Sequence, residues 1–386
     1  MRILVAPNAF KNSLAATEVA EAIKEGLHES KLHCTVDCFP VGDGGDGTAE
    51  LLLAYQKGIE ITATVHDPLM RRISSSFGLT PDHKTAIIEM ANASGLRLLR
   101  SNELDPLHAS SYGTGELIKR SLERGVNRII MCIGGSATVD GAVGSMQALG
   151  FQFLDSDDKG LTDMPETLVN LEKIDFSQVY KRVRQCKIVV LCDVENVLLG
   201  NDGAAAVFGP QKGAKPGDVK KLEGSLSKLS SIILKQTGKD ITTLKSGGAA
   251  GGMAAGLVAF LNADLVNGID YFLSFTKFDE SLERKDLVIT GEGSIDMQTL
   301  QGKGPFGVAK RAKDKKIPVI GLAGKISKEA VKPLEQYFDV LLSINSEPME
   351  LSDALLFARN NLTRTAKAIG DKLAAEGNFN KTIFYK

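Results

Sequence analysis

Charge of one sign, paired cysteines and long apolar runs are all scarce in this 386-residue sequence. Its 46 basic and 47 acidic residues leave a formal net charge of −1, which gives no electrostatic bias toward nucleic acid or a membrane surface. The cysteines are odd in number and mostly embedded in apolar segments. We therefore expect reduced thiols and a cytoplasmic protein. The five are Cys34, Cys38, Cys132, Cys186 and Cys192.

Only the segment from Ser246 to Ala263 is long and uncharged enough to resemble a membrane span. Five glycines dilute its hydrophobicity, and neither an aromatic belt nor a basic flank follows it. We expect a ligand-facing loop, Gly247 to Gly252, that leads into a buried helix. The N-terminus begins at once with a predicted strand, so we expect no signal peptide.

Three familiar catalytic patterns are missing. No Gly-x-x-x-x-Gly-Lys-Ser/Thr sequence occurs, which excludes a Walker A nucleotide site. The five histidines do not show the spacing of metal ligands, and no Gly-x-Ser-x-Gly elbow supports a serine hydrolase.

Apolar periodicity predicts strands that alternate with helices, in a chain long enough for two domains. The exception is residues 59–90, where three short antiparallel strands are expected at 59–65, 72–77 and 84–90. The other predicted strands are 2–6, 34–39, 128–133, 188–192, 287–290, 318–322 and 340–344, and the predicted helices are 15–27, 49–54, 115–124, 142–149, 306–313 and 351–376. We predict an α/β protein with a parallel, Rossmann-like domain, residues 1–61 and 283–386, and an inserted mixed α/β domain, residues 62–282.

The loop from Val41 to Thr48 is more than half glycine and carries two acids, Asp43 and Asp46, between a predicted strand and a predicted helix. Its Gly-x-Gly-x-x-Gly spacing matches a dinucleotide fingerprint, but acids are unsuited to a bare pyrophosphate. They suit Mg²⁺, ligand hydroxyls or a phosphate that a metal bridges. The alternative is a solvated turn.

Similar glycine loops recur at predicted strand ends, and loops of this kind gather in the ligand crevice of an open parallel sheet. Their lysines could neutralise phosphate, and their acids could hold a metal or accept a proton. That combination is what phosphoryl transfer needs. The lysines are Lys11, Lys212 and Lys303, and the acids are Asp43, Asp193, Glu292 and Asp296.

At five of these segments the chain resembles the type-1 glycerate kinase family. The segments are 6–14, 42–48 (GDGGDGT), 133–141, 207–214 and 290–296 (TGEGSID). Asn8 and Asp46 depart from the family pattern, which commonly has Asp and Glu there. The resemblance implies a two-domain enzyme with its active site in an interdomain cleft. It also implies that ATP and Mg²⁺ are used to phosphorylate D-glycerate, with 2-phosphoglycerate as the product and 3-phosphoglycerate as the alternative.

Candidate roles follow for the loop residues. For D-glycerate we expect Lys11, Ser13 and Asp43 with the amides of Gly44 and Gly45, Ser13 being alternatively a helix N-cap. For the nucleotide phosphates we expect Gly134, Gly135, Ser136, Ala137 and Thr138 with Lys212 and Lys303; the alternative is a tight turn with Asp140 as an N-cap.

The catalytic acids are Asp193 and Asp296. We expect Asp193 to be the general base and Asp296 a metal ligand or second candidate base, together with Glu292 as a metal ligand and with Lys11. The alternative for Asp193 is a cap of the helix that follows.

Two other functions stay open at this point. One is a non-catalytic regulator that binds a sugar acid or a nucleotide, and the other is an NAD-linked oxidoreductase. Neither nucleic acid nor a membrane is an expected partner, and a homodimer is an arrangement that the sequence leaves open.

Overall fold

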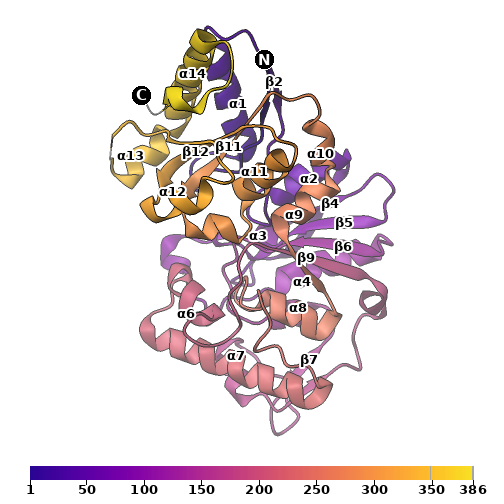
Figure 1. Ribbon diagram of the computed structural model, residues 1–386. Coiled ribbons are helices and arrows are strands. Elements are labelled where there is room, and N and C mark those ends of the chain that lie inside the picture. Colours follow the sequence, from indigo (N-terminus) through magenta and orange to yellow (C-terminus); the bar gives the residue numbers. More distant parts are fainter. Residues whose placement is uncertain (348, 385–386) are drawn as a thin grey trace. The chain divides into compact units, whose positions relative to one another are not determined.

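The computed structural model describes residues 1–347 and 349–384. The chain forms two compact units (Figure 1). The terminal unit consists of Met1–Asp43 and Asn267–Lys386, and the inserted unit consists of Gly44–Val266. These bounds differ from the expected ones at 61/62 and 282/283, and they divide the GDGGDGT loop between Asp43 and Gly44.

The terminal unit is built on a five-stranded sheet whose neighbouring strands are all parallel. Its order is β13 (Val340–Ser343), β12 (Val319–Ile326), β11 (Leu287–Ile295), β1 (Arg2–Val5) and β2 (Thr35–Cys38). Helices α1 (Ala16–His28) and α14 (Ala358–Glu376) lie side by side (Figure 1) and share one core with the sheet. Helix α11 (Gly304–Asp314) packs on β11 and β12. Burial of the sheet explains why its strands read as nearly continuous apolar runs.

Two predicted boundaries in the terminal unit are wrong. Strand β11 does not stop at residue 290 but runs on to Ile295. Its Gly291 serves close strand packing, not a turn, because a Cβ there would lie 2.2 Å from the Leu322 carbonyl oxygen. The predicted helix 351–376 is divided at Phe357 into α13 (Leu351–Leu356) and α14.

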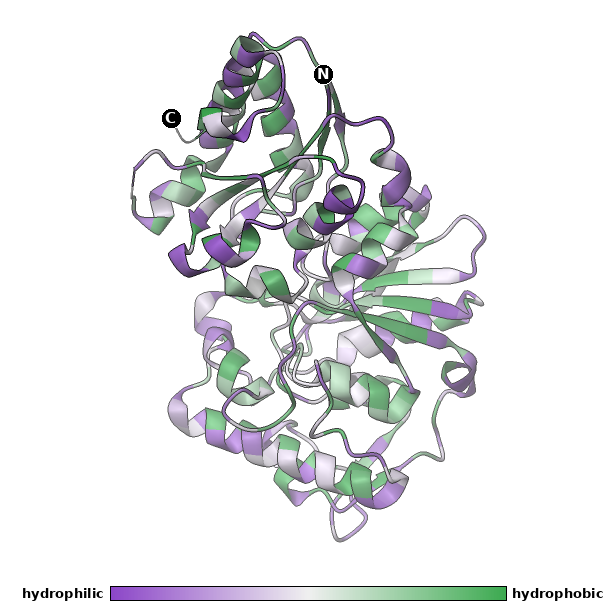
Figure 2. Ribbon diagram, viewed as in Figure 1, coloured by the Kyte–Doolittle hydropathy of each residue, from purple (hydrophilic) through white to green (hydrophobic). Residues whose placement is uncertain are grey.

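The inserted unit has a six-stranded mixed sheet. The three antiparallel strands expected at residues 59–90 are confirmed. The third of them also pairs with the next strand of the sheet in parallel, and that strand pairs in parallel with its own neighbour. The strand order is β10 (Asp264–Asn267), β9 (Lys187–Cys192), β6 (Arg128–Cys132), β5 (Thr85–Glu89), β4 (Arg72–Leu79) and β3 (Ile59–His66). In Figure 2 the strands are coloured mainly as hydrophobic, whereas the long helix α7 (Pro216–Thr237) alternates between hydrophobic and hydrophilic residues.

Helices cover the mixed sheet and continue its core. The principal ones are α2 (Thr48–Gln56), α4 (Tyr112–Glu123), α5 (Val143–Ala148), α7 and α8 (Met253–Leu261). The shorter elements are α3 (Ala91–Ser94), β7 (Gln152–Leu154), β8 (Lys173–Asp175) and α6 (Ala204–Phe208) here, with α9 (Gly268–Phe275), α10 (Phe278–Ser281) and α12 (Lys328–Leu334) in the terminal unit.

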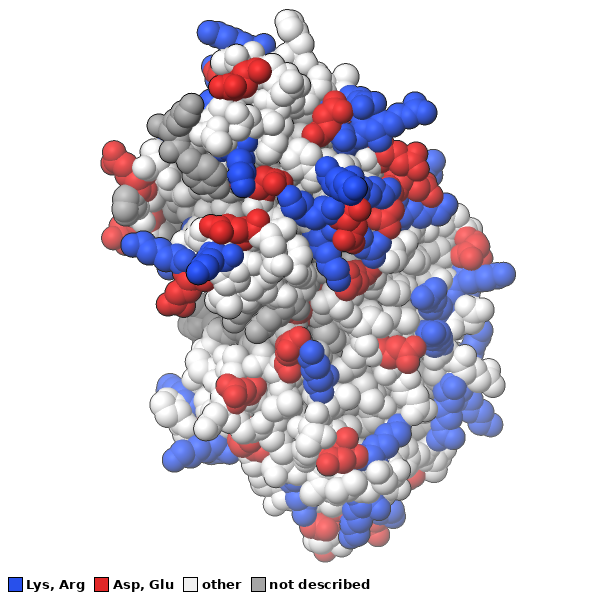
Figure 3. All heavy atoms as spheres, viewed as in Figure 1, with Lys and Arg blue, Asp and Glu red and all other residues white. Residues whose placement is uncertain are grey.

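Helix α8 is the buried helix expected after the glycine segment Gly247 to Gly252. Within the described ranges no helix combines the length and the apolar character needed to cross a membrane. Figure 3 shows acidic and basic side chains intermingled on the face that it draws, in agreement with the balanced composition.

Candidate active site

The terminal unit brings polar side chains together beyond the carboxyl ends of its parallel strands. Asp43 follows β2 and is only 7% exposed. Its Oδ2 accepts hydrogen bonds from Asn8 Nδ2, at 2.8 Å, and from the Gly304 amide, at 3.2 Å. Because Gly304 opens α11, the Asp43 carboxylate lies at a helix N-terminus, where the helix dipole favours negative charge. Asp43 is thus fixed in place by two separate segments.

Glu292 has the largest pKa shift among the described acids of the terminal unit. It is 7% exposed and accepts a hydrogen bond from Thr299 Oγ1 at 3.0 Å. Burial raises the pKa of Glu292 to about 8 against the opposing charge of Lys303, and the charges of Asp43 and Asp296 raise it further. At neutral pH the isolated protein therefore holds Glu292 mainly protonated, and a bound cation would favour its ionised form.

Asp296 and Lys303 lie near Glu292, because the Thr299 hydroxyl bonds both Glu292 and the Asp296 amide, and Lys303 lines a cavity together with Glu292. Asp296 follows the end of β11, half-buried, and its amide donates to Thr299 Oγ1 at 3.1 Å. Among the described residues no three His, Cys, Asp or Glu side chains are grouped so as to hold a metal ion. Oxygen ligands from one or two carboxylates nevertheless suit Mg²⁺, which commonly completes its shell with water and phosphate oxygens.

A cavity of about 860 Å³ opens beside these acids, within the terminal unit. Lys11, Glu292 and Lys303 are among the residues that line it. Ser13, a predicted substrate ligand, lies on its wall, and its hydroxyl donates to the Leu355 carbonyl oxygen at 2.7 Å. The N-cap alternative for Ser13 is wrong, because the N-cap of α1 is Ala15.

In the inserted unit the loop after β6 packs against the glycine loop before α2. The Gly134 amide donates to the Gly44 carbonyl oxygen at 3.0 Å, and a Cβ on Gly134 would lie 2.6 Å from Gly45 Cα. Gly135 has a positive φ of 68°, and a Cβ there would lie 2.0 Å from Asp46 Oδ1. The two glycines of the loop after β6 thus allow its close approach to the loop before α2.

Two of the amides expected to bind phosphate are engaged inside the fold. They belong to Gly134, described above, and to Ala137, which donates to the Ser94 carbonyl oxygen at 2.8 Å. The Thr138 hydroxyl, in contrast, is buried without a hydrogen-bond partner. Such an unpaired group is costly unless something binds it.

Lys212 is anchored to the loop after β6. It is 2% exposed, and its Nζ donates to Ser136 Oγ and to the Thr138 carbonyl oxygen, both at 2.7 Å. Burial lowers the pKa of Lys212 to about 7, although the charge of Asp140 opposes that shift. Lys212 therefore stabilises the loop conformation directly.

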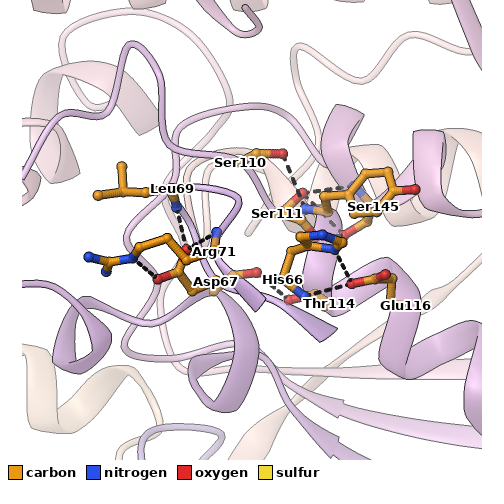
Figure 4. A network of polar contacts seen from close by, with 11 residues as sticks. His66, Asp67, Leu69, Arg71, Ser110, Ser111, Thr114, Glu116 and Ser145 are labelled. Atoms are coloured by element: carbon orange, nitrogen blue, oxygen red, sulfur yellow. Dashed lines mark hydrogen bonds and ion pairs between the residues drawn. The ribbon is translucent and has the colours of Figure 1, made fainter. Parts of the chain in front are cut away.

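Asp140 satisfies amides at the start of α5. Its Oδ2 accepts from the Ser111 amide at 2.9 Å, from the Ser111 hydroxyl at 2.7 Å and from the Gly144 amide at 3.2 Å. The Ser145 amide in turn donates to Ser111 Oγ at 3.0 Å (Figure 4). The N-cap of α5 is nevertheless Ala142, so the N-cap alternative for Asp140 is wrong, although its carboxylate accepts from the Ala142 and Gly144 amides at that end of the helix.

Asp193 directly follows β9 and is half-buried at the carboxyl end of that strand. The next helix, α6, begins at Ala204 with Gly203 as its N-cap, so the capping alternative for Asp193 is wrong.

The predicted site residues therefore fall into two groups. The terminal unit contains Lys11, Ser13, Asp43, Glu292, Asp296 and Lys303, and the inserted unit contains Gly44, Gly45, Gly134 to Thr138, Asp193 and Lys212. Sequence reasoning missed Thr299 and the cavity wall formed by α13, because neither has a motif of its own. It also missed Glu89, a buried acid whose carboxylate accepts from the Gly47 and Ala49 amides at the start of α2.

Comparison with known proteins assigns the chain to a family. A model of the glycerate kinase family matches residues 3–374. The glycerate 2-kinase of Escherichia coli K12 is 41% identical over 374 residues, which cover 97% of this chain and 98% of that protein. The glycerate kinase of Bacillus subtilis 168 is 42% identical over 384 residues and covers 100% of both chains. A crystal structure described as a glycerate kinase 2 from Salmonella typhimurium LT2 superposes with a TM-score of 0.81 at 41% identity, over 98% of this chain and 99% of that one. The chain belongs to the glycerate kinase family.

Proposed function

We propose that this protein transfers the terminal phosphoryl group of ATP to D-glycerate and releases 2-phosphoglycerate. The observation that carries the proposal is family membership over nearly the whole chain, from residue 3 to residue 374. The buried carboxyl groups Asp43 and Glu292, with Lys11 and Lys303 in the same unit, supply chemistry of the required kind. Retention of these acids and lysines disfavours a regulator that binds the ligands without catalysis.

In the terminal unit, Lys11 and Lys303 would neutralise the charges of phosphate and carboxylate groups. Glu292 and Asp296 would hold Mg²⁺, whose oxygen preference they satisfy and whose charge would compensate their mutual repulsion. The ion supplies neutralisation of the phosphate charge. Asp43, fixed by Asn8 and by the start of α11, would accept a hydrogen bond from a substrate hydroxyl.

In the inserted unit, we propose Asp193 as the group that accepts the proton of the reacting hydroxyl. Its position at the end of a buried strand holds its carboxylate on a rigid element, as the geometry of a general base requires. Asp296 is the second candidate. Lys212 would hold the loop from Gly134 to Thr138 in shape, and the unpaired Thr138 hydroxyl would be available to a phosphate oxygen.

The product can be identified by a coupled assay. Enolase dehydrates 2-phosphoglycerate directly, whereas 3-phosphoglycerate must first be isomerised by phosphoglycerate mutase. We expect ATP-dependent signal with D-glycerate and enolase alone. A signal that appears only after mutase is added would assign 3-phosphoglycerate, and no consumption of ATP would contradict the kinase assignment.

We further propose a cytoplasmic enzyme, on the basis of its free thiols. Three of these, Cys132, Cys186 and Cys192, are buried. A homodimer is the assembly that we would test first, by light scattering of the purified protein.

A further inference from the structure

The lining of the cavity in the terminal unit combines two chemical kinds of side chain. Lys11, Lys303 and Lys325 contribute positive charge, together with the carboxyl group of Glu292. Apolar side chains line it as well, among them Ile344, Met349, Leu351 and Leu355. A ligand that has both a negatively charged part and an apolar part would suit this lining.

The volume of about 860 Å³ is far larger than a small hydroxy acid needs. It lies within the range of about 300–1,000 Å³ that is typical of sites for cofactors and drug-sized ligands. D-Glycerate, which is polar throughout, would also leave the apolar side chains of the lining uncovered.

The apolar wall is held in place from both sides. Ser13 Oγ bonds the Leu355 carbonyl oxygen at 2.7 Å. Asn345 Nδ2 donates to the Gly324 carbonyl oxygen at 3.0 Å, while Asn345 Oδ1 accepts from Asn361 Nδ2 at 3.0 Å. These bonds connect the wall to the loop after β1, to β12 and to α14.

Some apolar side chains on this wall are nevertheless left open to water. Leu351 is 71% exposed and Met349 is 39% exposed, although both line the cavity. A planar apolar group bound in the cavity would cover part of that surface, and the hydrophobic effect would favour its binding.

We propose that the cavity of the terminal unit binds the nucleoside of ATP. The base lies against Ile344, Leu351 and Leu355, and the phosphates extend toward Lys11, Lys303 and Lys325. The inference rests on the proposed function and refines it. The sequence assigns the nucleotide phosphates mainly to the loop after β6 and leaves the nucleoside without a site. Ser13 then acts as a positioning residue for the nucleoside wall and not as a ligand of D-glycerate.

A bulky substitution in the wall tests the proposal. Ala354 lines the cavity on α13, whereas Ser352 lies on the same helix, is exposed and does not line it. Ala354→Phe should raise the KM for ATP by about tenfold or more, because a lost 1.4 kcal/mol of binding corresponds to tenfold in affinity. The KM for D-glycerate should change less than about twofold, and Ser352→Phe, which adds the same ring, should leave both constants unchanged. An Ala354→Phe enzyme with the wild-type KM for ATP would overturn the proposal.

Photolabelling of the wild-type protein gives a second test that no folding defect can affect. We expect 8-azido-ATP to label peptides that contain Ile344 or Leu355, and excess ATP to prevent the labelling. Labelling confined to the inserted unit would overturn the nucleoside assignment. Wild-type turnover of ATP with D-glycerate, measured in parallel, reports on the proposed function separately, so failure of one assignment is distinguishable from failure of the other.

Discussion

Replacement of Glu292 by glutamine should stabilise the protein at high pH and strongly lower its kinase activity. The ordinary pKa of this carboxyl group is 4.5, and in the fold it is raised to about 8, mainly by burial. Between pH 4.5 and about 8 the unfolded chain releases this proton while the folded chain keeps it, so the free energy of unfolding falls as the pH rises. At about 1.4 kcal/mol per pKa unit, the penalty reaches at most about 5 kcal/mol above pH 8. Glutamine does not titrate, and its Oε1 can still accept the Thr299 hydrogen bond.

The assay is urea unfolding of wild type and Glu292→Gln at pH 5 and pH 8, without divalent cations or nucleotide. Relative to the variant, the wild type should lose at least about 2 kcal/mol between the two pH values. Glu335→Gln, an exposed substitution in the same unit, should follow the wild type. Parallel pH dependences of wild type and Glu292→Gln would refute the reasoning. Kinase activity of the variant should fall by about two orders of magnitude or more, as expected when a group that stabilises the transition state is lost.

Three other substitutions separate catalytic from structural roles. Asp193→Asn should retain binding of ATP and D-glycerate in calorimetry while kcat falls by about 10²–10⁴, and turnover within about threefold of wild type across pH 6–9 would transfer the role of base to Asp296. Lys11→Met should lower kcat/KM by about tenfold or more with an unchanged melting temperature, since a hydrogen bond to a charged group contributes about 1.5–3 kcal/mol; wild-type kinetics would remove Lys11 from the site. Gly135→Ala should destabilise the protein by about 1–3 kcal/mol, because φ is positive at this position and the new Cβ would meet the Asp46 side chain. Gly217→Ala, where a Cβ would meet no atom within 4 Å, should not destabilise it. Equal melting temperatures of the two variants would contradict the close packing at Gly135.

Regular elements were predictable where local pattern and tertiary packing agree. The parallel strands of the terminal unit and the three antiparallel strands of the inserted unit were recovered within a few residues. The family was also recognised from its glycine loops, and the match over residues 3–374 confirms it. In both cases the information lies in contiguous residues.

Prediction failed where a residue serves a distant neighbour. Gly291 reads as a turn residue, yet it is needed because the Leu322 backbone approaches it. Ser13 reads as a cap or a ligand, yet its hydroxyl bonds a carbonyl more than 300 positions away along the chain. No local pattern could indicate either contact, because Gly291 faces a neighbouring parallel strand and Ser13 bonds a segment from the other end of the chain.

The meeting of Gly45 and Gly134 limits how this protein could be redesigned. A Cβ on Gly134 would lie 2.6 Å from Gly45 Cα, so the two backbones touch with no side chain between them. In most cores a larger residue at one position can be compensated by a smaller one opposite. Neither of these positions can become smaller, so compensatory pairs do not exist here. New substrate preferences would have to be engineered from the surrounding side chains while these two loops are inherited together.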